Sequence, residues 1–251
     1  MNYNFNDNTL LHSVMFNPFK LESILQNGIM SFNEASKSNF SFTRNTFGYN
    51  FDDYISMTRY MYVSFGDKNT SFYNYTLKGI TLIVEDQDFI YNQNEMYFNY
   101  PDEVFVKDKV DKENIKGILL PLKYLDYLLE ELPMFNLKST SYVNIKHTCD
   151  DLINYLKTLN YDVNMPLYNI YLNDLYQVVL KLQKDENNSM LLEEFMECKI
   201  SLNEFIAKEV QNAFDKKFNK KITTLEEMAT FIAEKYNKKI YYIDNLKYVR
   251  K

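Results

Sequence analysis

The sequence predicts an α+β protein with a strand-rich N-terminal domain at residues 1–135 and a mainly helical C-terminal domain at residues 136–251. Two observations predict this division. The glycines, which serve turns and close backbone approaches, all lie before residue 118, as do most short runs of β-branched residues. After that point the apolar residues recur at helical spacing. The boundary is expected between Pro133 and Ser141, where this periodicity is weak.

The first predicted elements are a strand at residues 9–15 and a helix that follows it. Asn17 with Pro18 is a typical helix start, because proline suits the first helical turn, and Asn27 with Gly28 is a typical helix end. Residues 32–50 are polar and are expected to form a loop. The apolar face of the helix is expected from Phe19, Leu21, Ile24 and Leu25.

Four further strands are predicted in the N-terminal half, from short apolar runs rich in β-branched residues. The run at residues 79–84 shows the pattern most clearly. The four predicted strands lie at residues 53–58, 79–84, 102–107 and 115–120.

Helix starts in the second half are predicted from the capping-box pattern, in which Ser or Thr is followed three residues later by Glu. Ser201 with Glu204 and Thr224 with Glu227 both match it. We expect roughly four helices and a closing strand at residues 239–243. One buried helix face after Thr224 is expected from Leu225, Met228, Ala229, Ile232 and Ala233.

Composition and charge exclude several classes of protein. Hydrophobic residues make up 46% of the chain and charged residues 25%, which is typical of globular proteins rather than disordered ones. The net charge of −6 disfavours non-specific coating of nucleic acid, which needs clustered cations. The chain shows neither a signal-peptide pattern nor an apolar run of about 18 residues. We therefore expect a cytoplasmic protein that does not act in a membrane.

Neither a metal centre nor a phosphate-binding glycine loop is predicted. His147 and Cys149 offer two ligand types, but the chain has two histidines in all, and zinc needs three or four ligands at close spacing. The simpler interpretation is a surface histidine and a small buried thiol beside a helix start, with Cys149 and Cys198 both reduced. The sequence contains neither GxGxxG nor GxxxxGK[ST], which excludes Rossmann and P-loop enzymes.

Three short motifs follow one another in the N-terminal half. The first joins Leu11-His12-Ser13 to the helix and turn at residues 21–29, and the second is Tyr-Ile-Ser-Met-Thr-Arg at residues 54–59. The third is the strand that carries Glu103, followed by Asn-Ile-Lys-Gly-Ile at residues 114–118. Over residues 8–121 this order resembles the ADP-ribosyltransferase superfamily, particularly bacterial and phage members such as the DarT-like toxins.

The resemblance implies a split β-sheet with a nicotinamide-binding cleft, and NAD as the substrate. It implies a catalytic role for Glu103, while His12, Arg59, Ser56 and Thr58 would bind NAD. These residue types suit the chemistry. A carboxylate can stabilise the positive charge that develops on the ribose C1′ when nicotinamide leaves. A forked guanidinium can clamp a pyrophosphate.

The function implied by the resemblance is mono-ADP-ribosyl transfer from NAD to a macromolecular acceptor, either protein or nucleic acid. The chain would then be a toxin, an effector or a phage-encoded modifier. A second protein that neutralises its activity would be a further expected partner. The helical C-terminal region would recognise the target or pack as a cap.

The sequence departs from the branch of this superfamily that modifies arginine side chains. Position 105 is Phe, so Glu103 is not part of a Glu-x-Glu pair, and Ser139-Thr140-Ser141 follows the Glu103 strand instead of preceding it. Two other functions stay open. One is an RNA 2′-phosphotransferase-like enzyme, although the arginines are sparse (Arg44, Arg59 and Arg250). The other is a non-catalytic binding protein on the same scaffold.

Each site residue also has a simpler interpretation. Glu103 would be solvated, as most acidic residues are, Arg59 would lie on the surface, and His12, between Leu11 and Val14 in sequence, would be a satisfied core histidine. Because Val104 and Val106 share one strand face, Glu103 shares the other face with Phe105. That placement favours a cleft for the carboxylate.

Overall fold

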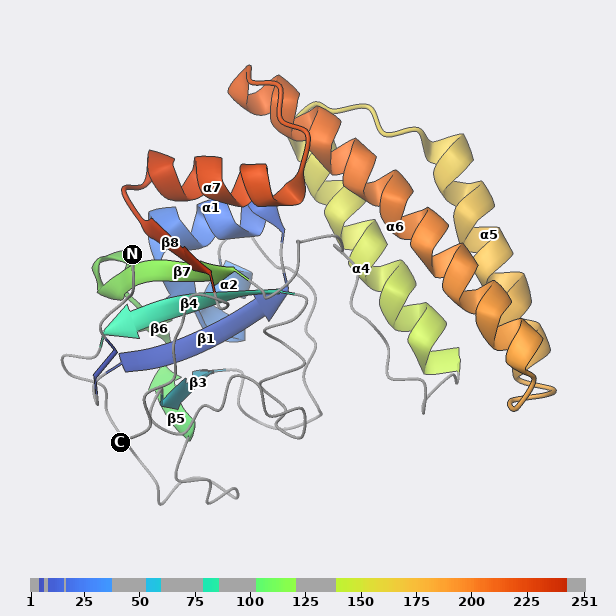
Figure 1. Cartoon of the computed structure of the whole chain (residues 1–251), viewed down its shortest axis with the longest axis horizontal. Helices are drawn as coiled ribbons and strands as arrows, with labels where there is room; N and C mark the ends of the chain where they lie inside the picture. The colour runs from blue at the N-terminus through green and yellow to red at the C-terminus, as the bar shows by residue number, and fades with distance from the viewer. Residues whose placement is uncertain are drawn as a thin grey trace. The chain divides into compact units, whose positions relative to one another are not determined.

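The computed structural model describes residues 5–6, 9–15, 17–37, 53–59, 79–85, 103–120 and 139–242 (Figure 1). The chain divides into two compact units, Met1–Asp126 with Glu226–Lys251, and Tyr127–Leu225. The first unit is built on a mixed β-sheet, and the described part of the second is helical. The predicted order, a sheet followed by helices, is therefore confirmed.

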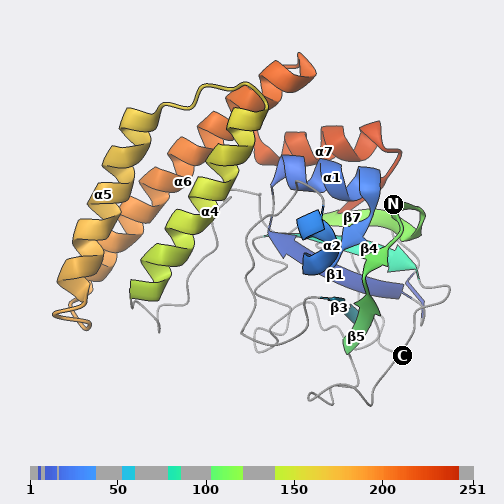
Figure 2. The same cartoon turned by 180° about the vertical axis from the view of Figure 1, so that it is seen from behind.

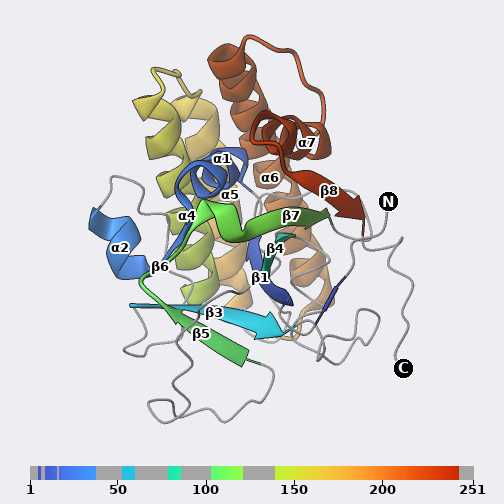
Figure 3. The ribbon, with the colours of Figure 1, turned by 90° about the vertical axis from the view of Figure 1, so that its left-hand side faces the viewer.

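Six strands form the sheet of the first unit, in the order β5-β3-β1-β4-β7-β8 (Figure 3). Neighbouring strands run antiparallel except β7 and β8, which run parallel. All six predicted strands are confirmed with nearly the same bounds. They are β1 (Thr9–Met15), β3 (Tyr54–Arg59), β4 (Gly79–Glu85), β5 (Glu103–Lys107), β7 (Ile115–Leu120) and β8 (Lys239–Tyr242).

Strand β1 is joined very differently to its two neighbours. It pairs with β4 along its whole length. Between the described strands β1 and β3, pairing is limited to Leu10 opposite Arg59 and Leu11 opposite Thr58. Strands β3 and β5 are therefore attached to the rest of the sheet at one end, a connection that we call the β1–β3 junction.

Helix α1 (Pro18–Asn27) follows β1 and has the predicted start and end. The Asn17 side chain accepts hydrogen bonds from the backbone N–H groups of Phe19 and Lys20. At the other end Gly28 has φ = 94° and donates its N–H to the Ile24 carbonyl. A Cβ on Gly28 would lie 2.2 Å from the Val110 carbonyl oxygen, so both the conformation and the space require glycine here.

The predicted loop at residues 32–50 is wrong for its first part, because residues Phe32–Lys37 form the short helix α2. The Ser31 hydroxyl accepts from the N–H of Glu34 and caps this helix, a local bond that polarity alone does not reveal. Residues 38–50 lie outside the described residues. The remaining small elements nearby are β2 (Ile29–Met30), which pairs with β6 (Lys109–Val110), and the 3₁₀ helix η3 (Lys112–Asn114).

Helix α7 (Leu225–Lys235) lies beside α1, as Figures 1 and 2 show from opposite sides. Its Lys235 ammonium donates to the buried Glu22 carboxylate of α1 at 2.7 Å. The helix begins directly after Thr224, so the start predicted there is confirmed.

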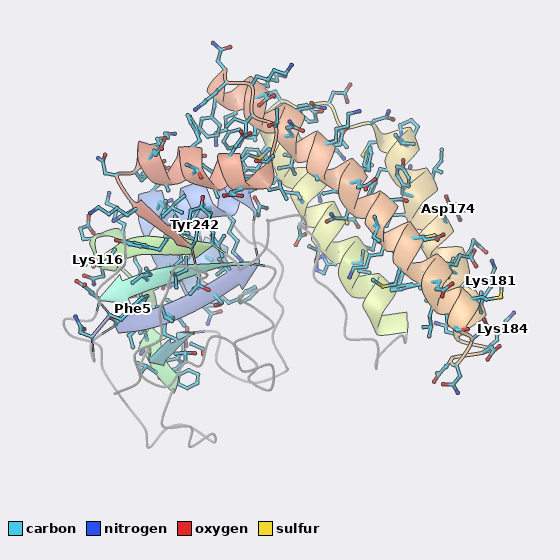
Figure 4. All side chains as sticks on the ribbon, viewed as in Figure 1. Phe5, Lys116, Asp174, Lys181, Lys184 and Tyr242 are labelled. Atoms are coloured by element: carbon cyan, nitrogen blue, oxygen red, sulfur yellow. The ribbon has the colours of Figure 1, made fainter. Side chains whose placement is uncertain are left out.

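Strand β8 adds to the sheet beside β7, with Ile240 opposite Ile118. A Cβ on Gly117 would lie 2.7 Å from the Tyr241 ring, so this glycine permits the close approach of β8. The Tyr242 hydroxyl, labelled in Figure 4, donates to Glu226 of α7 at 2.6 Å. We assigned residues 136–251 to one helical domain, but the part from Glu226 groups with the sheet unit. A parallel pairing requires a crossover between distant segments, which local sequence patterns do not reveal.

The second unit consists of three long helices, α4 (Ser139–Thr158), α5 (Met165–Leu182) and α6 (Ser189–Phe218). Asn164 and Asn188 cap the starts of α5 and α6 by accepting from backbone N–H groups three residues later. Asn219 ends α6 in the left-handed conformation. None of the described helices combines the length and apolar character needed to cross a membrane.

The helix start predicted at Ser201 is wrong, because Ser201 lies inside the continuous helix α6. Buried residues occur on both sides of it, Phe195 before and Leu202, Phe205 and Ile206 after. One apolar face therefore runs through the position. The capping-box pattern was misleading because Ser and Glu three residues apart are also tolerated within a helix.

Candidate functional site

The five residues implicated by the resemblance lie on three adjacent strands of the sheet. His12 is on β1, Ser56, Thr58 and Arg59 are on β3, and Glu103 is on β5. The backbone register aligns Leu11 of β1 with Thr58, and Thr58 with Glu103. Because neighbouring strands lie about 4.8 Å apart, the backbones of β1 and β5 in this row are about 10 Å apart.

The register also separates some of these side chains. Successive side chains of a strand point to opposite faces, and directly paired residues share a face. Thr58 pairs with Leu11, so His12, the next residue of β1, projects from the face opposite Thr58. Ser56 is exposed and Thr58 is half-buried. For Arg59 and Glu103 the structure describes the backbone position alone.

The side chain of His12 bridges the two strands where their pairing stops. Its Nδ1 lies 2.9 Å from the backbone carbonyl oxygen of Ser56. A carbonyl oxygen can only accept a hydrogen bond, so Nδ1 carries the proton and donates it. The imidazole thus takes the role of a backbone donor at the β1–β3 junction and ties β3 to β1.

His12 is neutral at physiological pH. Burial lowers the pKa of its imidazole to about 4, the nearby charge of Lys20 also lowers it, and the hydrogen bond to Ser56 partly opposes both effects. Since Nδ1 carries the proton of the neutral ring, Nε2 has a free lone pair. The Nε2 atom can therefore accept a hydrogen bond from a hydroxyl group. The interpretation of His12 as a satisfied core histidine is too simple, because the side chain is half-buried and the Ser56 bond uses one of its two nitrogens.

Lys20 of α1 is part of this neighbourhood, although the sequence analysis did not single it out. It lies in the first turn of α1, its side chain is half-buried, and burial lowers the pKa of its ammonium group. Within the described part of the chain, no hydrogen bond or ion pair involves its Nζ atom. A lysine three residues after a helix-capping Asn is the sequence signal that could have identified it, because cations are disfavoured there.

The hydroxyl of Ser13, next to His12, forms a hydrogen bond within the sheet. Ser13 Oγ and the buried Thr81 Oγ1 of β4 lie 2.7 Å apart and form a hydrogen bond between directly paired residues. Ser13 therefore helps to hold β1 against β4.

The structure bears out the simpler interpretation of His147 and Cys149. The His147 side chain is 62% exposed, whereas Cys149 is fully buried, which raises the pKa of its thiol. A buried protonated thiol is a poor nucleophile. Both residues lie inside α4 and not beside a helix start, because α4 begins at Ser139. Among the described residues, no three His, Cys, Asp or Glu side chains are grouped in a way that would hold a metal ion.

No protein-family model matches the chain, and no curated protein or solved structure is significantly similar to it.

Proposed function

We propose that this protein transfers ADP-ribose from NAD to a macromolecular acceptor. The observation that carries the proposal is that the implicated positions lie on the adjacent strands β1, β3 and β5, on both faces of the sheet, with neutral His12 bonded across the β1–β3 junction. The limited pairing of β1 with β3 also suits the split sheet that the resemblance implies.

The reaction exchanges one bond at the anomeric carbon of the nicotinamide ribose. The bond from C1′ to the nicotinamide nitrogen breaks, and its electron pair leaves with nicotinamide as a neutral molecule. A nucleophilic atom of the acceptor forms the new bond to C1′ and loses a proton to solvent or a nearby base. Positive charge develops on the ribose, and the carboxylate of Glu103 would stabilise it.

The neutral state of His12 suits it to binding a ribose. Its Nε2 lone pair would accept a hydrogen bond from a ribose hydroxyl, which a protonated imidazole could not do. Arg59 would contact the pyrophosphate, and Ser56 and Thr58 would help to position the nucleotide. Because Thr58 and His12 belong to opposite faces, they would contact different parts of it.

The test is nicotinamide release from NAD by the purified full chain, with and without cell lysate. We expect Glu103→Gln to slow release by about 10²–10³-fold, because the developing charge loses its counterion. Glu113→Gln is the matched control, since Glu113 lies exposed in η3, and it should release nicotinamide at the wild-type rate. Circular dichroism would establish that both variants are folded.

The outcomes separate the alternatives. NAD-dependent labelling of a protein or nucleic acid in the lysate, lost in Glu103→Gln, supports the proposal and identifies the acceptor class. NAD consumption that requires RNA with a 2′-phosphate would favour the phosphotransferase-like enzyme. NAD binding without turnover would favour the binding protein, and absence of both binding and turnover would overturn the proposal.

A further inference from the structure

We propose that His12 is a positioning residue, whose hydrogen bond to the Ser56 carbonyl sets the place of strands β3 and β5, and so of Glu103, relative to β1. The role of Glu103 rests on the proposed function. The hold of His12 on the two strands rests on the geometry of the sheet alone. This role uses Nδ1, so it is separate from the ribose contact proposed for Nε2.

Strands β3 and β5 form a two-stranded unit at the edge of the sheet, which we call the β3–β5 ribbon (Figure 3). The pairing extends over the whole of β5 and ends with Thr58 opposite Glu103. Strand β5 is the outer strand, so its position relative to β1 is set through β3. Whatever fixes the ribbon therefore fixes most of the implicated positions together, namely Ser56, Thr58, Arg59 and Glu103.

The β3–β5 ribbon is attached to the rest of the sheet unit at its two ends. At one end, two residues of β1 pair with β3 at the β1–β3 junction. At the other end, the Asp108 N–H donates to the Asp53 carbonyl at 2.6 Å, and the Asp108 carbonyl accepts from the Ser31 N–H at 2.8 Å. Between these ends, residues 54–57 of β3 do not pair with the described residues of β1. Movement of the ribbon toward or away from β1 is thus least restricted along this stretch.

The His12 imidazole contacts the ribbon within this unpaired stretch. Its Nδ1 donates to the Ser56 carbonyl at 2.9 Å. Among the described residues, no other side-chain hydrogen bond joins β1 to β3. Because a carbonyl oxygen is fixed in its peptide plane, this bond sets the rotation of β3 about its own axis as well as its distance from β1.

Strand β5 converts such a rotation into a displacement of Glu103. Neighbouring strands lie about 4.8 Å apart, so a rotation of the ribbon by about 10° about β3 would move the β5 backbone by about 0.8 Å. A misplacement of about 1 Å can lower the rate of a catalysed reaction by about 100-fold. The bond from His12 to Ser56 should therefore act on kcat, whereas a ribose contact made by Nε2 should act on KM.

Two substitutions of His12 separate the functions of its two ring nitrogens. Asparagine has an amide nitrogen at the position of Nδ1 and no group at Nε2, whereas glutamine has its amide at the position of Nε2. In hydrogen exchange of the free full chain, we expect the amides of β3 and β5 to exchange about 5–10-fold faster in His12→Gln. In His12→Asn they should exchange as in wild type.

Ser13→Ala is the matched control, because it removes the side-chain hydrogen bond from the next residue of β1 to Thr81 of β4. It should leave the exchange of β3 and β5 unchanged. Unchanged exchange in His12→Gln would overturn the inference. A rise in His12→Gln that is as large in β4 and β7 as in β3 and β5 would also overturn it, because it would reflect general destabilisation.

Nicotinamide release by the same proteins tests whether the positioning reaches Glu103. His12→Gln should lower kcat by about 10–100-fold. His12→Asn should keep kcat within about threefold of the wild-type value and raise the KM for NAD instead. A loss of kcat in His12→Asn as large as that in His12→Gln would overturn the positioning role of the Nδ1 bond.

The two proposals fail in different ways. Faster exchange of β3 and β5 in His12→Gln, without any turnover of NAD by the wild-type protein, would retain the hold of His12 on the ribbon and reject ADP-ribosyl transfer. Turnover of NAD that depends on Glu103, with the wild-type kcat in His12→Gln, would retain the transfer and reject the positioning role.

Discussion

The two units of the chain differ at half-buried polar side chains, although the buried polar residues of the sheet unit, Thr9, Glu22, Ser31 and Thr81, all have partners. In the helical unit, two buried side chains have partners from the same unit. The Tyr168 hydroxyl donates to Asp150 at 2.8 Å, and the buried Glu209 carboxylate accepts from the N–H of Asn164 at 3.3 Å. Among the described residues of the sheet unit, neither the His12 Nε2 atom nor the Lys20 ammonium has a hydrogen-bond partner.

This difference makes the sheet unit the part of the chain in which the proposed ligand binding should be tested. Burying a polar group without a partner costs free energy, so such groups are rare unless they serve another purpose. The bonds of Tyr168 and Glu209 lie within the helical unit, so no ligand is required to explain these two groups. The sheet unit retains a cation and an acceptor that a ligand would satisfy.

Substitutions in the two cores test the division into units and should have the largest effect on stability. Phe214 of α6 and Leu82 of β4 are both fully buried. Phe214→Ala should cost about 3–5 kcal/mol and Leu82→Ala about 2–5 kcal/mol, because each leaves a cavity. By hydrogen exchange, Phe214→Ala should expose amides of α5 and α6, and Leu82→Ala those of β4, β7 and β8. If either substitution raised the hydrogen-exchange rates equally in both units, the two units would unfold as one cooperative structure.

Acidification should destabilise the sheet unit through His12. Its pKa is about 4 in the folded protein against an ordinary value of 6.5, so between these values the unfolded state binds the proton and the folded state does not. The free energy of unfolding therefore falls as the pH is lowered through this window, and the contribution levels off below it. The loss is about 3 kcal/mol at most, at 1.36 kcal/mol per pKa unit.

Urea denaturation at about pH 7 and about pH 4.5 would measure this contribution. The exposed His147 provides the matched control, because it is the other histidine of the chain. We expect wild type and His147→Gln to lose similar stability between the two pH values, and His12→Gln to lose less. Equal losses in all three proteins would contradict the assignment of a half-buried, neutral His12.

Two lysine–glutamate pairs, one in each unit, compare a buried carboxylate with an exposed one. Glu22 in the pair with Lys235 has a side chain that is 8% exposed, whereas Glu194 in the pair with Lys181 is 44% exposed. Figure 4 labels Lys181 at the end of α5. In chemical denaturation, Lys235→Met should lower the free energy of unfolding by about 1–2 kcal/mol, because the buried Glu22 carboxylate loses a charged donor. Lys181→Met should cost about 0.5 kcal/mol or less. Equal losses of stability in the two variants would mean that the Glu22 carboxylate does not need the hydrogen bond from Lys235.

The two capping-box sequences should respond oppositely to alanine, with the smallest effects of the series. Thr224 directly precedes α7, so Thr224→Ala should cost about 1 kcal/mol. Ser201 lies inside α6, where alanine is the better helix former, so Ser201→Ala should be neutral or stabilising by about 0.5 kcal/mol. Thermal melts of the two variants would measure this. A larger loss for Ser201→Ala would show that its hydroxyl has a structural role in α6.

Local sequence patterns predicted the elements of the sheet unit well. The strands were recognisable from short apolar runs, and α1 from Asn17, Pro18 and Gly28, because strand propensity, capping and positive φ are properties of a few neighbouring residues. The same reasoning failed at Ser201, where the burial of Phe195 and Leu202 along one face decides that the helix continues.

The candidate site was only partly accessible from sequence. The order of the motifs singled out His12, Arg59 and Glu103 as positions, and the register of β1, β3 and β5 aligns their strands. The proton position on His12 and the nearness of Lys20 to it could not be predicted. Both depend on the Ser56 carbonyl and on α1 packing near β1, which are contacts between different elements.

Local patterns in the sequence predicted the six described strands of the main sheet and the buried faces of α1 and α7, although not α2 or the continuity of α6. The tertiary structure decided the order of the strands, the return of α7 and β8 to the first unit, and the neutral state of His12. The physical reason is the range of the interactions. Capping and propensity act within a few residues, whereas strand pairing, burial and the field of a nearby lysine act between segments that only the folded chain brings together.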